Sequence, residues 1–531
     1  MKSEVNIVKT LPFLNQKAGT SGLRKSVNDF KKKNFLENYI QSIINSNLFS
    51  SSEIIIGSDG RYFSKEAIEI TLKICIANNI KKIILGEKGI LSTPALSYLI
   101  KFNKSDGGIN FSASHNPGGK DGDFGIKINS SNGGPIVQRW IEKIFKETLK
   151  ISSFKTVDLK KKININQKNI FKINNTLIEI IDPVDDYVNF LQNIFDFSLI
   201  KSLFKSNFKF TFNAMNGVTG PYAKKIFCDI FELDEKHIIN SFPKQDFGGL
   251  IPDPCFENAK DFYKLFNDNS RYDMGALSDG DGDRNIILAK NFELSSSDSL
   301  AIIVQYSHKI LNLKQPLNGV ARSFPTSKAL DKVAQKRNLK VFETPTGWKF
   351  FSNLLDNGLV TICGEESAGL GSDHIREKDG LWAILFWLSI IAITKNSVKQ
   401  IVENHWIEYG RFFSKRYDYN ILTKKKLRHI FKIMKNYSIN NQELKVMGIK
   451  KIIDFEYFDP IEKVYYKDQG KVIFFNDKNL RLSVRQSGTN SKKYLLRIYV
   501  EYYSKNYNNE SFINKKMDSV LSDFVKIFMI T

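Results

Sequence analysis

Cysteine is scarce in this chain of 531 residues. The four cysteines, Cys75, Cys228, Cys255 and Cys363, lie far apart in the sequence and form no CxxC pair. A disulfide framework or a structural zinc site requires cysteines that are paired at suitable spacings. The sequence therefore argues against both, and its thiols fit a reducing cytosol.

Long apolar runs are also lacking. The most apolar stretch, residues 381–393, has about 13 residues, whereas a helix needs about 20 to cross a bilayer. We therefore expect a buried core helix there and no membrane partner. The amino-terminal residues show no basic-then-apolar signal pattern, so we expect the protein in the cytoplasm.

Acidic residues are outnumbered, because 78 Lys and Arg residues face 56 Asp and Glu residues and give a formal charge of +22. Such a balance suits nucleic acid or anionic metabolites. No nucleic-acid-binding signature is present, and the short runs at residues 160–162 and 424–426 are typical of solvated surfaces. After the second run, helical spacing predicts that one face is buried, the face formed by Leu427, Ile430, Phe431 and Met434. We expect no nucleic-acid partner, and attraction of phosphorylated substrates is the favoured use of the charge.

The first three-quarters of the chain alternates strand-like and helix-like segments. An apolar fraction of 42% is typical of globular proteins, and the length predicts three or four domains. Strands are predicted at residues 53–57, 82–86 and 108–114, with helices at residues 65–78 and 95–102. This βαβ pattern predicts a largely parallel sheet with active groups at the carboxyl ends of its strands.

Two further rounds of the same pattern follow an Asn- and Lys-rich stretch, residues 159–175, which is expected to be a surface excursion. The second round has strands at residues 209–213 and 274–279 and a helix at residues 219–231. The third has strands at residues 319–322, 340–343 and 360–363. The tail differs, since residues 471–475, 481–485 and 495–503 are predicted to be antiparallel strands of a smaller α+β domain.

Ser114 ends the third predicted strand and precedes His115, Asn116 and a Pro-Gly-Gly turn. A hydroxyl at the point where a strand breaks into a turn is exposed for chemistry. Alone, such a residue is an ordinary loop serine. It gains meaning from the carboxylates and cationic residues of three other loops.

The second loop holds Asp279, Asp281 and Asp283, which alternate with glycines. Three such close carboxylates repel one another, and oxygen-only ligands favour a hard cation such as Mg²⁺. An EF-hand is excluded, because its required glycine and terminal glutamate are replaced by Arg284 and Lys290. A solvated acidic turn is the alternative.

The other two loops suit a sugar phosphate. Arg485, Ser487, Gly488, Thr489 and Arg497 combine guanidinium groups, hydroxyls and a flexible backbone, which together can hold a phosphate. Glu365, Glu366 and Ser367 offer acceptors for sugar hydroxyls, although paired carboxylates also occur in glycosidases. Lys378 precedes the predicted core helix and is a candidate acid. The four loops together indicate phosphoryl transfer on a polar substrate.

The chain resembles the α-D-phosphohexomutase superfamily, and within it the α-phosphoglucomutases of the animal and proteobacterial type. The resemblance spans essentially the whole chain. Besides the four loops, it includes these segments: residues 19–25 (GTSGLRK), 89–94 (GILSTP), 122–127 (GDFGIK), 246–249 (DFGG), 343–351 (ETPTGWKFF) and 371–382 (GSDHIREKDGLW).

The resemblance implies three consecutive α/β domains with mixed, largely parallel sheets and a smaller C-terminal α+β domain, around a central active-site cleft. We place these domains at residues 1–182, 183–296, 297–404 and 405–531. They would carry the phosphoserine loop, the metal loop, the sugar loop and the phosphate loop, respectively.

The resemblance also implies a role for each site residue. Ser114 would carry a phosphate and, with Asp279, Asp281 and Asp283, hold one Mg²⁺. Arg24, His115, Lys127 and Lys378 would line the transfer site, and Arg284 would lie beside the phosphoserine. Substrate would be bound by Thr20, Arg24, Asp283, Arg284, Thr346, Gly347, Glu365, Ser367, Lys378, Arg485, Ser487, Gly488, Thr489 and Arg497.

The implied activity is a phosphoglucomutase that interconverts glucose 1-phosphate and glucose 6-phosphate, with glucose 1,6-bisphosphate as activator and intermediate, acting as a monomer or weak dimer. The chain departs from the family pattern at Ser112, Ser278, Ala368 and Asn490. A preference for mannose phosphates, a bisphosphate synthase and a non-catalytic scaffold stay open as alternatives, as does the identity of the general acid and base.

Overall fold

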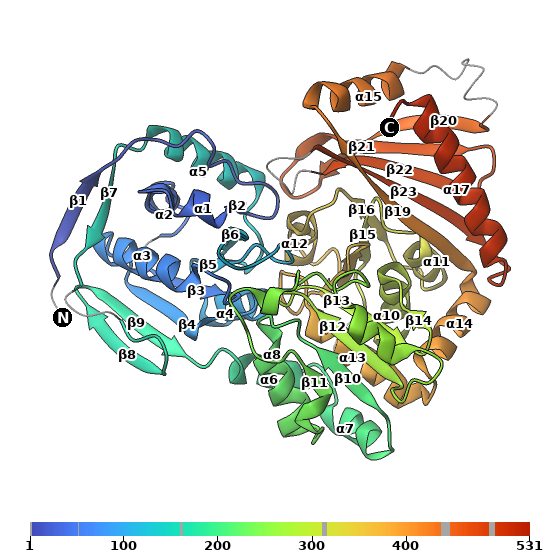
Figure 1. The fold of residues 1–531 in the computed structure, drawn as a ribbon, viewed down its shortest axis with the longest axis horizontal. Helices are drawn as coiled ribbons and strands as arrows, with labels where there is room; N and C mark the ends of the chain where they lie inside the picture. The colour runs from blue at the N-terminus through green and yellow to red at the C-terminus, as the bar shows by residue number, and fades with distance from the viewer. Residues whose placement is uncertain are drawn as a thin grey trace. The chain divides into compact units, whose positions relative to one another are not determined.

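The computed structural model describes residues 3–50, 52–159, 163–310, 316–436, 447–487 and 494–530. The chain forms two compact units. Unit 1 comprises Met1–Leu294, Tyr306–Pro316 and Ser367–Val398, and unit 2 comprises Ser295–Gln305, Leu317–Glu366 and Lys399–Thr531. Figure 1 labels the elements of both units.

Unit 1 begins with a seven-stranded sheet whose middle is parallel. Its strands, in spatial order, are β2 (Leu23–Ser26), β6 (Asp123–Ser130), β5 (Gly107–Phe111), β3 (Glu53–Ser58), β4 (Lys82–Ile90), β9 (Thr176–Ile181) and β8 (Asn169–Ile173). Strands β5, β3, β4 and β9 run parallel, whereas β6, β2 and β8 extend the sheet in antiparallel fashion. The prediction of a largely parallel sheet here is confirmed.

Both faces of this sheet are covered, because its central strands are continuous apolar runs. Ile54, Ile55 and Ile56 are all buried, which is typical of parallel strands between helix layers. One face packs against α1 (Val27–Phe30), α2 (Phe35–Asn45), α3 (Ser64–Ala77) and α5 (Gln138–Lys150). On the other face α4 (Thr93–Asn103) approaches closely, since a Cβ at Gly108 would lie 3.0 Å from Ile100. A separate ribbon pairs β1 (Val5–Lys9) with β7 (Ser153–Val157).

The second sheet of unit 1 has five strands. Their order is β11 (Ile238–Ile239), β10 (Phe210–Asn213), β12 (Met274–Ser278), β13 (Asn285–Ala289) and β14 (Phe292–Glu293). The first three strands are parallel, and β13 and β14 return antiparallel. The predicted helix at residues 219–231 begins as α8 (Thr219–Ala223) but continues with π-helical turns over Lys224–Ile230.

Helix α13 (Gly380–Thr394) in unit 1 is buried on all sides, as the sequence predicted for residues 381–393. It begins at Asp379, whose side chain accepts a hydrogen bond from the Trp382 backbone N–H, the usual arrangement of an N-cap. Among the described residues, no single helix is long and apolar enough to cross a membrane; only α13 and α14 (Val398–Tyr409), taken as a bent pair, meet that length and composition. The other helices of unit 1 are α6 (Asp185–Gln192), α7 (Phe197–Lys205) and α9 (Lys260–Tyr263), and β18 (Gly369–Ser372) precedes α13.

Unit 2 contains a parallel sheet and an antiparallel sheet. The parallel strands are β15 (Val320–Ser323), paired with β16 (Val341–Thr344) on one side and β17 (Ile362–Glu365) on the other. Helices α11 (Ala329–Lys336) and α12 (Trp348–Asp356) connect them, and α10 (Ser296–Ile310) precedes them. The antiparallel sheet has the order β19 (Arg411–Ile421), β23 (Tyr494–Ser504), β22 (Leu480–Ser487), β21 (Val464–Phe475) and β20 (Ile449–Asp459).

One core lies under the antiparallel sheet. Leu482, Leu496 and Ile498 pack there against Leu427, Ile430 and Met434 of α15 (Lys424–Asn436) and against Met517 of α17 (Glu510–Ile527). The predicted apolar face of residues 424–434 is confirmed, with Phe431 half-buried beside it. The lysine-rich helix is therefore a packed element with a solvated basic side.

Part of the predicted surface excursion at residues 159–175 is regular structure. Residues 169–173 form β8, the edge strand beside β9, and Phe171 packs against the core. Exposed polar residues along an edge strand, such as Asn169 and Lys172, conceal the alternation that marks a strand. Residues 160–162 lie outside the described residues, and the domain boundaries at residues 182, 296 and 404 stay predictions.

Leu482→Ala tests the core under the antiparallel sheet. Leu482 is fully buried, so truncation should cost about 2–5 kcal/mol of unfolding free energy through lost burial and a residual cavity. Thermal and urea unfolding would measure this loss. Lys450→Ala, an exposed change on β20 of the same sheet, should be nearly neutral. Equal stability of both variants would contradict the assigned core.

Candidate active site

Ser114 lies in the turn that follows β5 and has a left-handed backbone, with φ of +53°. Few residues other than glycine adopt this conformation without support from their surroundings. The residue is only 1% exposed, so the expectation of an exposed hydroxyl is wrong, because Arg61 and the carboxylate loop pack against this turn. Its Oγ lies 3.1 Å from Asp279 Oδ2 and 3.2 Å from His115 Nδ1. The predicted nucleophile therefore faces one of the predicted metal ligands.

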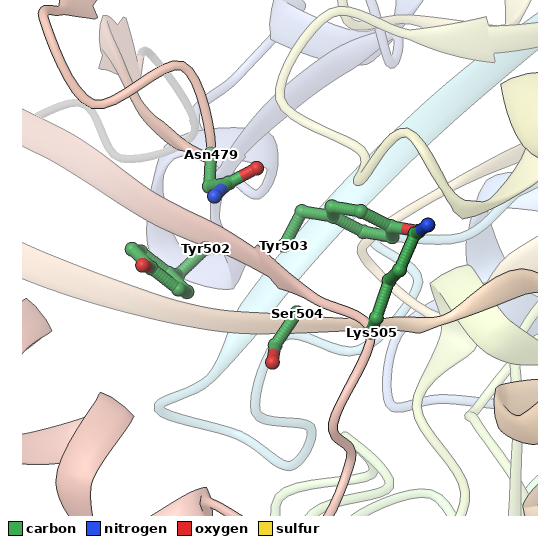
Figure 2. A pocket seen from close by; sticks show the side chains of 5 residues that line it. All are labelled: Asn479, Tyr502, Tyr503, Ser504 and Lys505. Atoms are coloured by element: carbon green, nitrogen blue, oxygen red, sulfur yellow. The ribbon is translucent and has the colours of Figure 1, made fainter.

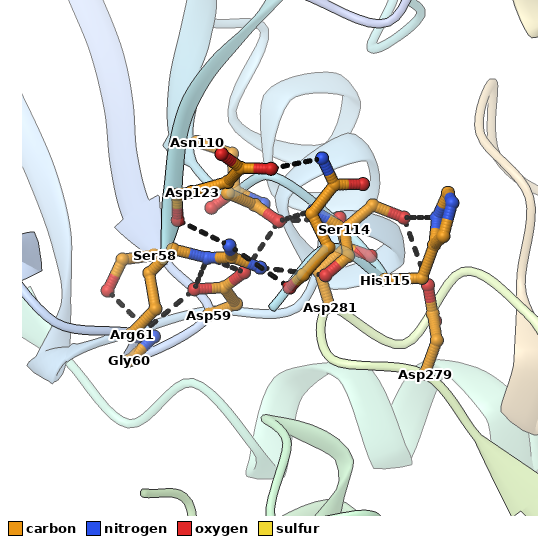
Figure 3. A network of polar contacts seen from close by, with 12 residues as sticks. Ser58, Asp59, Gly60, Arg61, Asn110, Ser114, His115, Asp123, Asp279 and Asp281 are labelled. Atoms are coloured by element: carbon orange, nitrogen blue, oxygen red, sulfur yellow. Dashed lines mark hydrogen bonds and ion pairs between the residues drawn. The ribbon is translucent and has the colours of Figure 1, made fainter. Parts of the chain in front are cut away.

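A buried ion pair holds the backbone of Ser114 (Figure 3). Arg61 Nε contacts both carboxylate oxygens of Asp59, at 3.0 and 2.9 Å, and Arg61 Nη2 donates to the Ser114 carbonyl at 2.7 Å. Asp59 accepts from Ser112 Oγ at 2.7 Å, and the same Oγ accepts from the Ser114 backbone N–H at 2.7 Å. The pair thus fixes both peptide groups of the nucleophile. Ser112 supplies the required hydroxyl although the family usually has threonine there.

Asp279, Asp281 and Asp283 follow the end of β12 and gather in one buried cluster, with a carboxylate oxygen from each lying within 4.8 Å of the others. Gly280 lets this loop approach the serine loop, because a Cβ at that position would lie 2.9 Å from the Ser114 carbonyl oxygen. Asp279 Oδ1 accepts the backbone N–H groups of Asp283 and Arg284, both at 3.0 Å. The three predicted metal ligands are therefore brought together beside Ser114.

The electrostatics of the cluster are unequal. Burial, followed by repulsion from Asp283 and Asp281, raises the pKa of Asp279 well above its ordinary value. Burial acts on Asp283 too, but Lys127 and Lys378 outweigh it and lower the pKa of that carboxyl. The protein's own cations therefore do not balance the negative charge of all three carboxylates. The uncompensated repulsion acts mainly on Asp279.

This donor set fits a divalent metal ion. All three side chains offer hard oxygen ligands, and among the described residues the buried Asp281 Oδ1 has no hydrogen-bond partner. An unsatisfied buried carboxylate oxygen is costly unless a cation contacts it. A divalent cation there would also relieve the mutual repulsion.

Cationic side chains surround the cluster in unit 1. Lys127 on β6 pairs with Asp281 and lies 3.0 Å from Asp283 Oδ2, while Lys378 Nζ lies 3.2 Å from Asp283 Oδ1. Burial alone would lower the pKa of Lys127, but the two aspartates raise it. Arg284 Nη1 pairs with Asp253 at 3.2 Å. These positions agree with a site for an anionic group.

Arg24 and His115 are half-buried beside these cations. Burial, together with the charges of Arg284 and Arg61, lowers the pKa of Arg24, although Asp281 opposes the shift. Burial, then Arg284 and Arg24, lowers the pKa of His115 well below its ordinary value. The imidazole is therefore neutral at neutral pH and can accept a proton at one nitrogen.

The predicted sugar loop belongs to unit 2 up to Glu366. Glu365 Oε1 accepts from the Gly347 backbone N–H at 2.8 Å, which ties β17 to the segment before α12. Gly347 has φ of +130°, a conformation that favours glycine. Thr346 has a buried hydroxyl without a hydrogen-bond partner among the described residues.

The predicted phosphate loop also lies in unit 2. Arg485 on β22 and Arg497 on β23 are directly opposite each other in the antiparallel register. Ser487 ends β22 with a buried hydroxyl that lacks a hydrogen-bond partner within the described part of the chain. Gly488, Thr489 and Asn490 lie outside the described residues.

The surroundings of Thr20, Ser367 and Ala368 do not by themselves indicate substrate binding. Thr20 is exposed in a tight turn closed by Gly19 and Gly22 before β2. Ser367 is half-buried, and the following Ala368 has φ of +67° and packs in the core with Met215. Ala368 therefore fills core space, and its carbonyl accepts from the Asn285 N–H at 3.0 Å.

Sequence reasoning missed Asp59, Arg61 and Thr93. Thr93 donates to Asp281 Oδ2 at 2.7 Å. Asp59 and Arg61 directly follow β3, so the rule that singled out Ser114, polar residues at a strand's carboxyl end, also applies to them.

A surface depression of about 330 Å³, lined by Asn479, Tyr502, Tyr503, Ser504 and Lys505, contains no predicted site residue (Figure 2).

Comparison with family models covers nearly the whole chain. Residues 15–155, 185–292 and 295–409 match the phosphoglucomutase/phosphomannomutase alpha/beta/alpha domains I, II and III, and residues 411–530 match the phosphoglucomutase-1 C-terminal domain. The predicted fold class, three α/β domains and a smaller C-terminal domain, is confirmed.

Individual relatives show which members of this family the chain is similar to in sequence and structure. Phosphoglucomutase-1 of Dictyostelium discoideum is 44% identical and that of Homo sapiens 43% identical, each aligning 94% of this chain with 92% of the relative. The open form of the Paramecium phosphoprotein pp63/parafusin, a phosphoglucomutase, superposes with a TM-score of 0.87 at 38% identity, covering 98% of this chain and 97% of that one. The chain belongs to the α-D-phosphohexomutase superfamily, among the phosphoglucomutase-1-like members. The resemblance stated from the sequence is confirmed.

Arg61→Leu tests the ion pair behind the nucleophile. The change leaves the fully buried Asp59 carboxylate without its counter-charge, so it should cost about 3–5 kcal/mol of unfolding free energy. Lys32→Met breaks the surface pair with Asp29 and should cost no more than about 1 kcal/mol. Thermal unfolding would measure both variants. Similar small losses would show that the buried pair is not essential to the loop.

Mg²⁺ titration tests the carboxylate cluster. A cation that binds only the folded state at about 100 times its Kd should add about 2.7 kcal/mol of stability. The melting temperature should therefore rise with Mg²⁺ in the wild type and much less in Asp281→Asn, which removes one ligand charge. An equal rise in the two proteins would place the cation elsewhere.

Proposed function

We propose that the chain interconverts α-D-glucose 1-phosphate and glucose 6-phosphate through a phosphoserine at Ser114. The main support for this reaction is the contact between Ser114 Oγ and Asp279 Oδ2, which lie 3.1 Å apart. Asp279 belongs to a buried cluster of three carboxylates with cationic side chains around it. Such a cluster suits a phosphoryl group, whose transfer needs positioning and charge stabilisation more than covalent chemistry.

The first step moves the phosphoryl group from Ser114 to the sugar. The free 6-hydroxyl of glucose 1-phosphate attacks phosphorus, an O–P bond forms to the sugar, and the bond to Ser114 Oγ breaks. The product is glucose 1,6-bisphosphate, and the sugar's hydroxyl proton leaves as Ser114 Oγ gains one. The reverse step, with the phosphate at carbon 1, restores the phosphoserine and releases glucose 6-phosphate.

The residues around the cluster stabilise the charge that spreads over the phosphoryl oxygens. Arg24, Lys127, Arg284 and Lys378 would supply fixed positive charge. Asp279, Asp281, Asp283 and the phosphate on Ser114 would hold one Mg²⁺, which supplies further positive charge to the transferring group when bound. Asp283 would also hold Lys378 in place.

The predicted sugar and phosphate loops would hold the rest of the substrate. Thr346, Gly347, Glu365 and Ser367 would orient the sugar hydroxyls, and Thr20 is a further proposed substrate ligand. Arg485, Ser487, Gly488, Thr489 and Arg497 would bind the phosphate that does not react. A single cradle suffices, because each phosphate of the intermediate occupies it in turn.

Proton transfer is assigned to His115 and Lys378. His115 Nδ1 lies 3.2 Å from Ser114 Oγ, within reach of the proton that this oxygen gains or loses. Lys378 is held at the carboxylate cluster and would serve the sugar hydroxyl. We further propose that the enzyme acts in the cytoplasm as a monomer or weak dimer, without nucleic acid or membrane, and prefers glucose to mannose phosphates.

Ser114→Ala tests the proposed reaction. In a coupled assay for glucose 6-phosphate, the wild type with Mg²⁺ and a trace of glucose 1,6-bisphosphate should turn over glucose 1-phosphate. EDTA and Ser114→Ala should each reduce the rate by at least about 10³-fold, because one removes the metal and the other the phosphoryl carrier. Intact-mass measurement should find one phosphate on the wild type and none on the variant.

Ser202→Ala, a change at an exposed serine of α7, is the matched control and should keep the full rate. An undiminished rate in Ser114→Ala would rule out the phosphoserine pathway. A folded, phosphorylated wild type without turnover would favour a scaffold or a bisphosphate synthase. Mannose 1-phosphate in the same assay ranks the sugar preference.

A further inference from the structure

The two adjacent glutamates at the end of β17 have different surroundings. Glu365 reaches the Gly347 backbone N–H, whereas Glu366 faces β15 and β22. Ser323 Oγ donates to Glu366 Oε2 at 2.9 Å, and Thr326 Oγ1 lies 3.4 Å from the same oxygen. The Glu366 backbone N–H donates to Thr326 Oγ1 at 3.0 Å. Glu366 is therefore fixed at both its backbone and its side chain.

The other carboxylate oxygen of Glu366 faces the predicted phosphate cradle. Glu366 Oε1 lies 3.8 Å from Arg485 Nη2, and the two side chains are only 12% and 10% exposed. Arg485 Nε donates to Tyr499 Oη at 3.2 Å. Arg485 is thus held from two directions, by a hydroxyl at Nε and by a carboxylate at Nη2.

Arg485 needs such a partner because of its position in the sheet. Arg497 lies directly opposite it on β23, and like charges at such a pair destabilise a sheet. Arg497 has its own counter-ion, Asp418, at 3.4 Å. Glu366 is the corresponding counter-ion of Arg485, and it comes from the strand that ends in the sugar loop.

The distance between the ions bears on their role. At 3.8 Å the pair attracts but makes no close hydrogen bond of the bidentate kind. The guanidinium therefore keeps N–H donors for another anion while its position is held. In Arg61, by contrast, Nε contacts both oxygens of Asp59 and both Nη groups donate to backbone carbonyls, so fewer donors remain.

We propose that Glu366 is the positioning residue of Arg485, holding the guanidinium where it binds the non-reacting phosphate and linking the sugar loop to the phosphate cradle. This inference rests on the proposed function, which assigns Arg485 to that phosphate. Glu366 itself acts through Arg485 and makes no contact with the sugar.

The charge of Glu366 is consistent with this role. Burial would raise the pKa of Glu366, but the charge of Arg485 and hydrogen bonds from Tyr499 and Ser323 lower it. The carboxylate is therefore ionised at neutral pH. Burial and the same carboxylate raise the pKa of Tyr499, so its hydroxyl stays protonated and able to donate a hydrogen bond.

Glu366→Gln tests the proposal, because glutamine keeps the size and the acceptor for Ser323 but removes the charge. The KM for glucose 1-phosphate should rise about tenfold, with kcat within about threefold, since a charge-assisted contact that orients a binding group is lost. Inorganic phosphate, as a competitive inhibitor, should weaken by the same factor. An unchanged KM and phosphate inhibition constant would overturn the proposal.

Glu343→Gln is the matched control. Glu343 is a carboxylate of the same unit that pairs with Arg322 and Arg481, at 2.7 and 3.3 Å, and does not contact Arg485. This variant should lower the melting temperature while leaving KM within about twofold, because a structural pair affects stability and not phosphate binding. A KM rise equal to that of Glu366→Gln would mean that any lost charge in the unit has this effect, and would overturn the assignment.

A double-mutant cycle separates action through Arg485 from direct contact with the sugar. In an Arg485→Gln background, Glu366→Gln should change KM by less than about twofold, because its partner is already absent. Additive effects would show that Glu366 acts independently of Arg485. Weakened sugar phosphate binding with unchanged phosphate inhibition would likewise make Glu366 a sugar ligand, contrary to the proposal.

Calorimetry keeps the two proposals distinguishable. If the wild type shows no mutase turnover, the proposed function fails, but binding of inorganic phosphate by the wild type, Glu366→Gln and Arg485→Gln still decides the role of Glu366. A tenfold weaker, Arg485-dependent phosphate affinity in Glu366→Gln supports positioning. Equal affinity in the three proteins overturns it.

Discussion

The carboxylate cluster in unit 1 depends on keeping three negative charges together out of water. Burying one carboxylate is costly, and burying Asp279, Asp281 and Asp283 within a few ångströms adds their mutual repulsion. Lys127, on a strand, and Lys378, in a loop, neutralise part of this negative charge by ion pairs with Asp281 and Asp283. The two sheets of unit 1 bring the serine loop, the aspartate loop and these lysines, which are far apart in the sequence, close together in space. A divalent cation and a phosphoryl group, as proposed, would balance the charge that these side chains leave uncompensated.

Two buried arginines illustrate different uses of an ion pair. Arg61 gives its Nε–H to the two oxygens of Asp59 and its Nη groups to backbone carbonyls, so all three of its nitrogens are engaged behind Ser114. Arg485 gives its Nε–H to Tyr499 but lies 3.8 Å from its carboxylate at Nη2, so its Nη donors remain available. The geometry of the counter-ion thus distinguishes Arg61, which supports a loop, from Arg485, for which we propose phosphate binding.

The sequence predicted the architecture and, through the family resemblance, the gathering of Ser114 with the three aspartates, for identifiable reasons. Strands such as Glu53–Ser58 and the helix Gly380–Thr394 are continuous apolar runs, which local patterns reveal. Ser114 and the three aspartates occupy turns at the carboxyl ends of strands, where active groups of α/β proteins gather. Family resemblance then supplied roles that spacing alone could not.

What the sequence did not reveal depends on contacts between distant segments. Asp59 and Arg61 look like an ordinary polar turn until Ser112 and Ser114 are placed beside them. The different surroundings of Glu365 and Glu366 arise because one faces Gly347 and the other β22, which no local pattern contains. The edge strand at residues 169–173 was hidden by its polar residues.

The backbone of Ser114 limits which hydroxyl-bearing residue can serve as the proposed phosphate carrier at this position. Threonine carries the same hydroxyl and accepts a phosphate equally well in chemical terms. Its branched Cβ, however, makes a left-handed conformation a steric outlier, whereas serine tolerates φ of +53° when its peptide groups are held. The loop therefore selects serine over threonine by shape, before any difference in reactivity is considered.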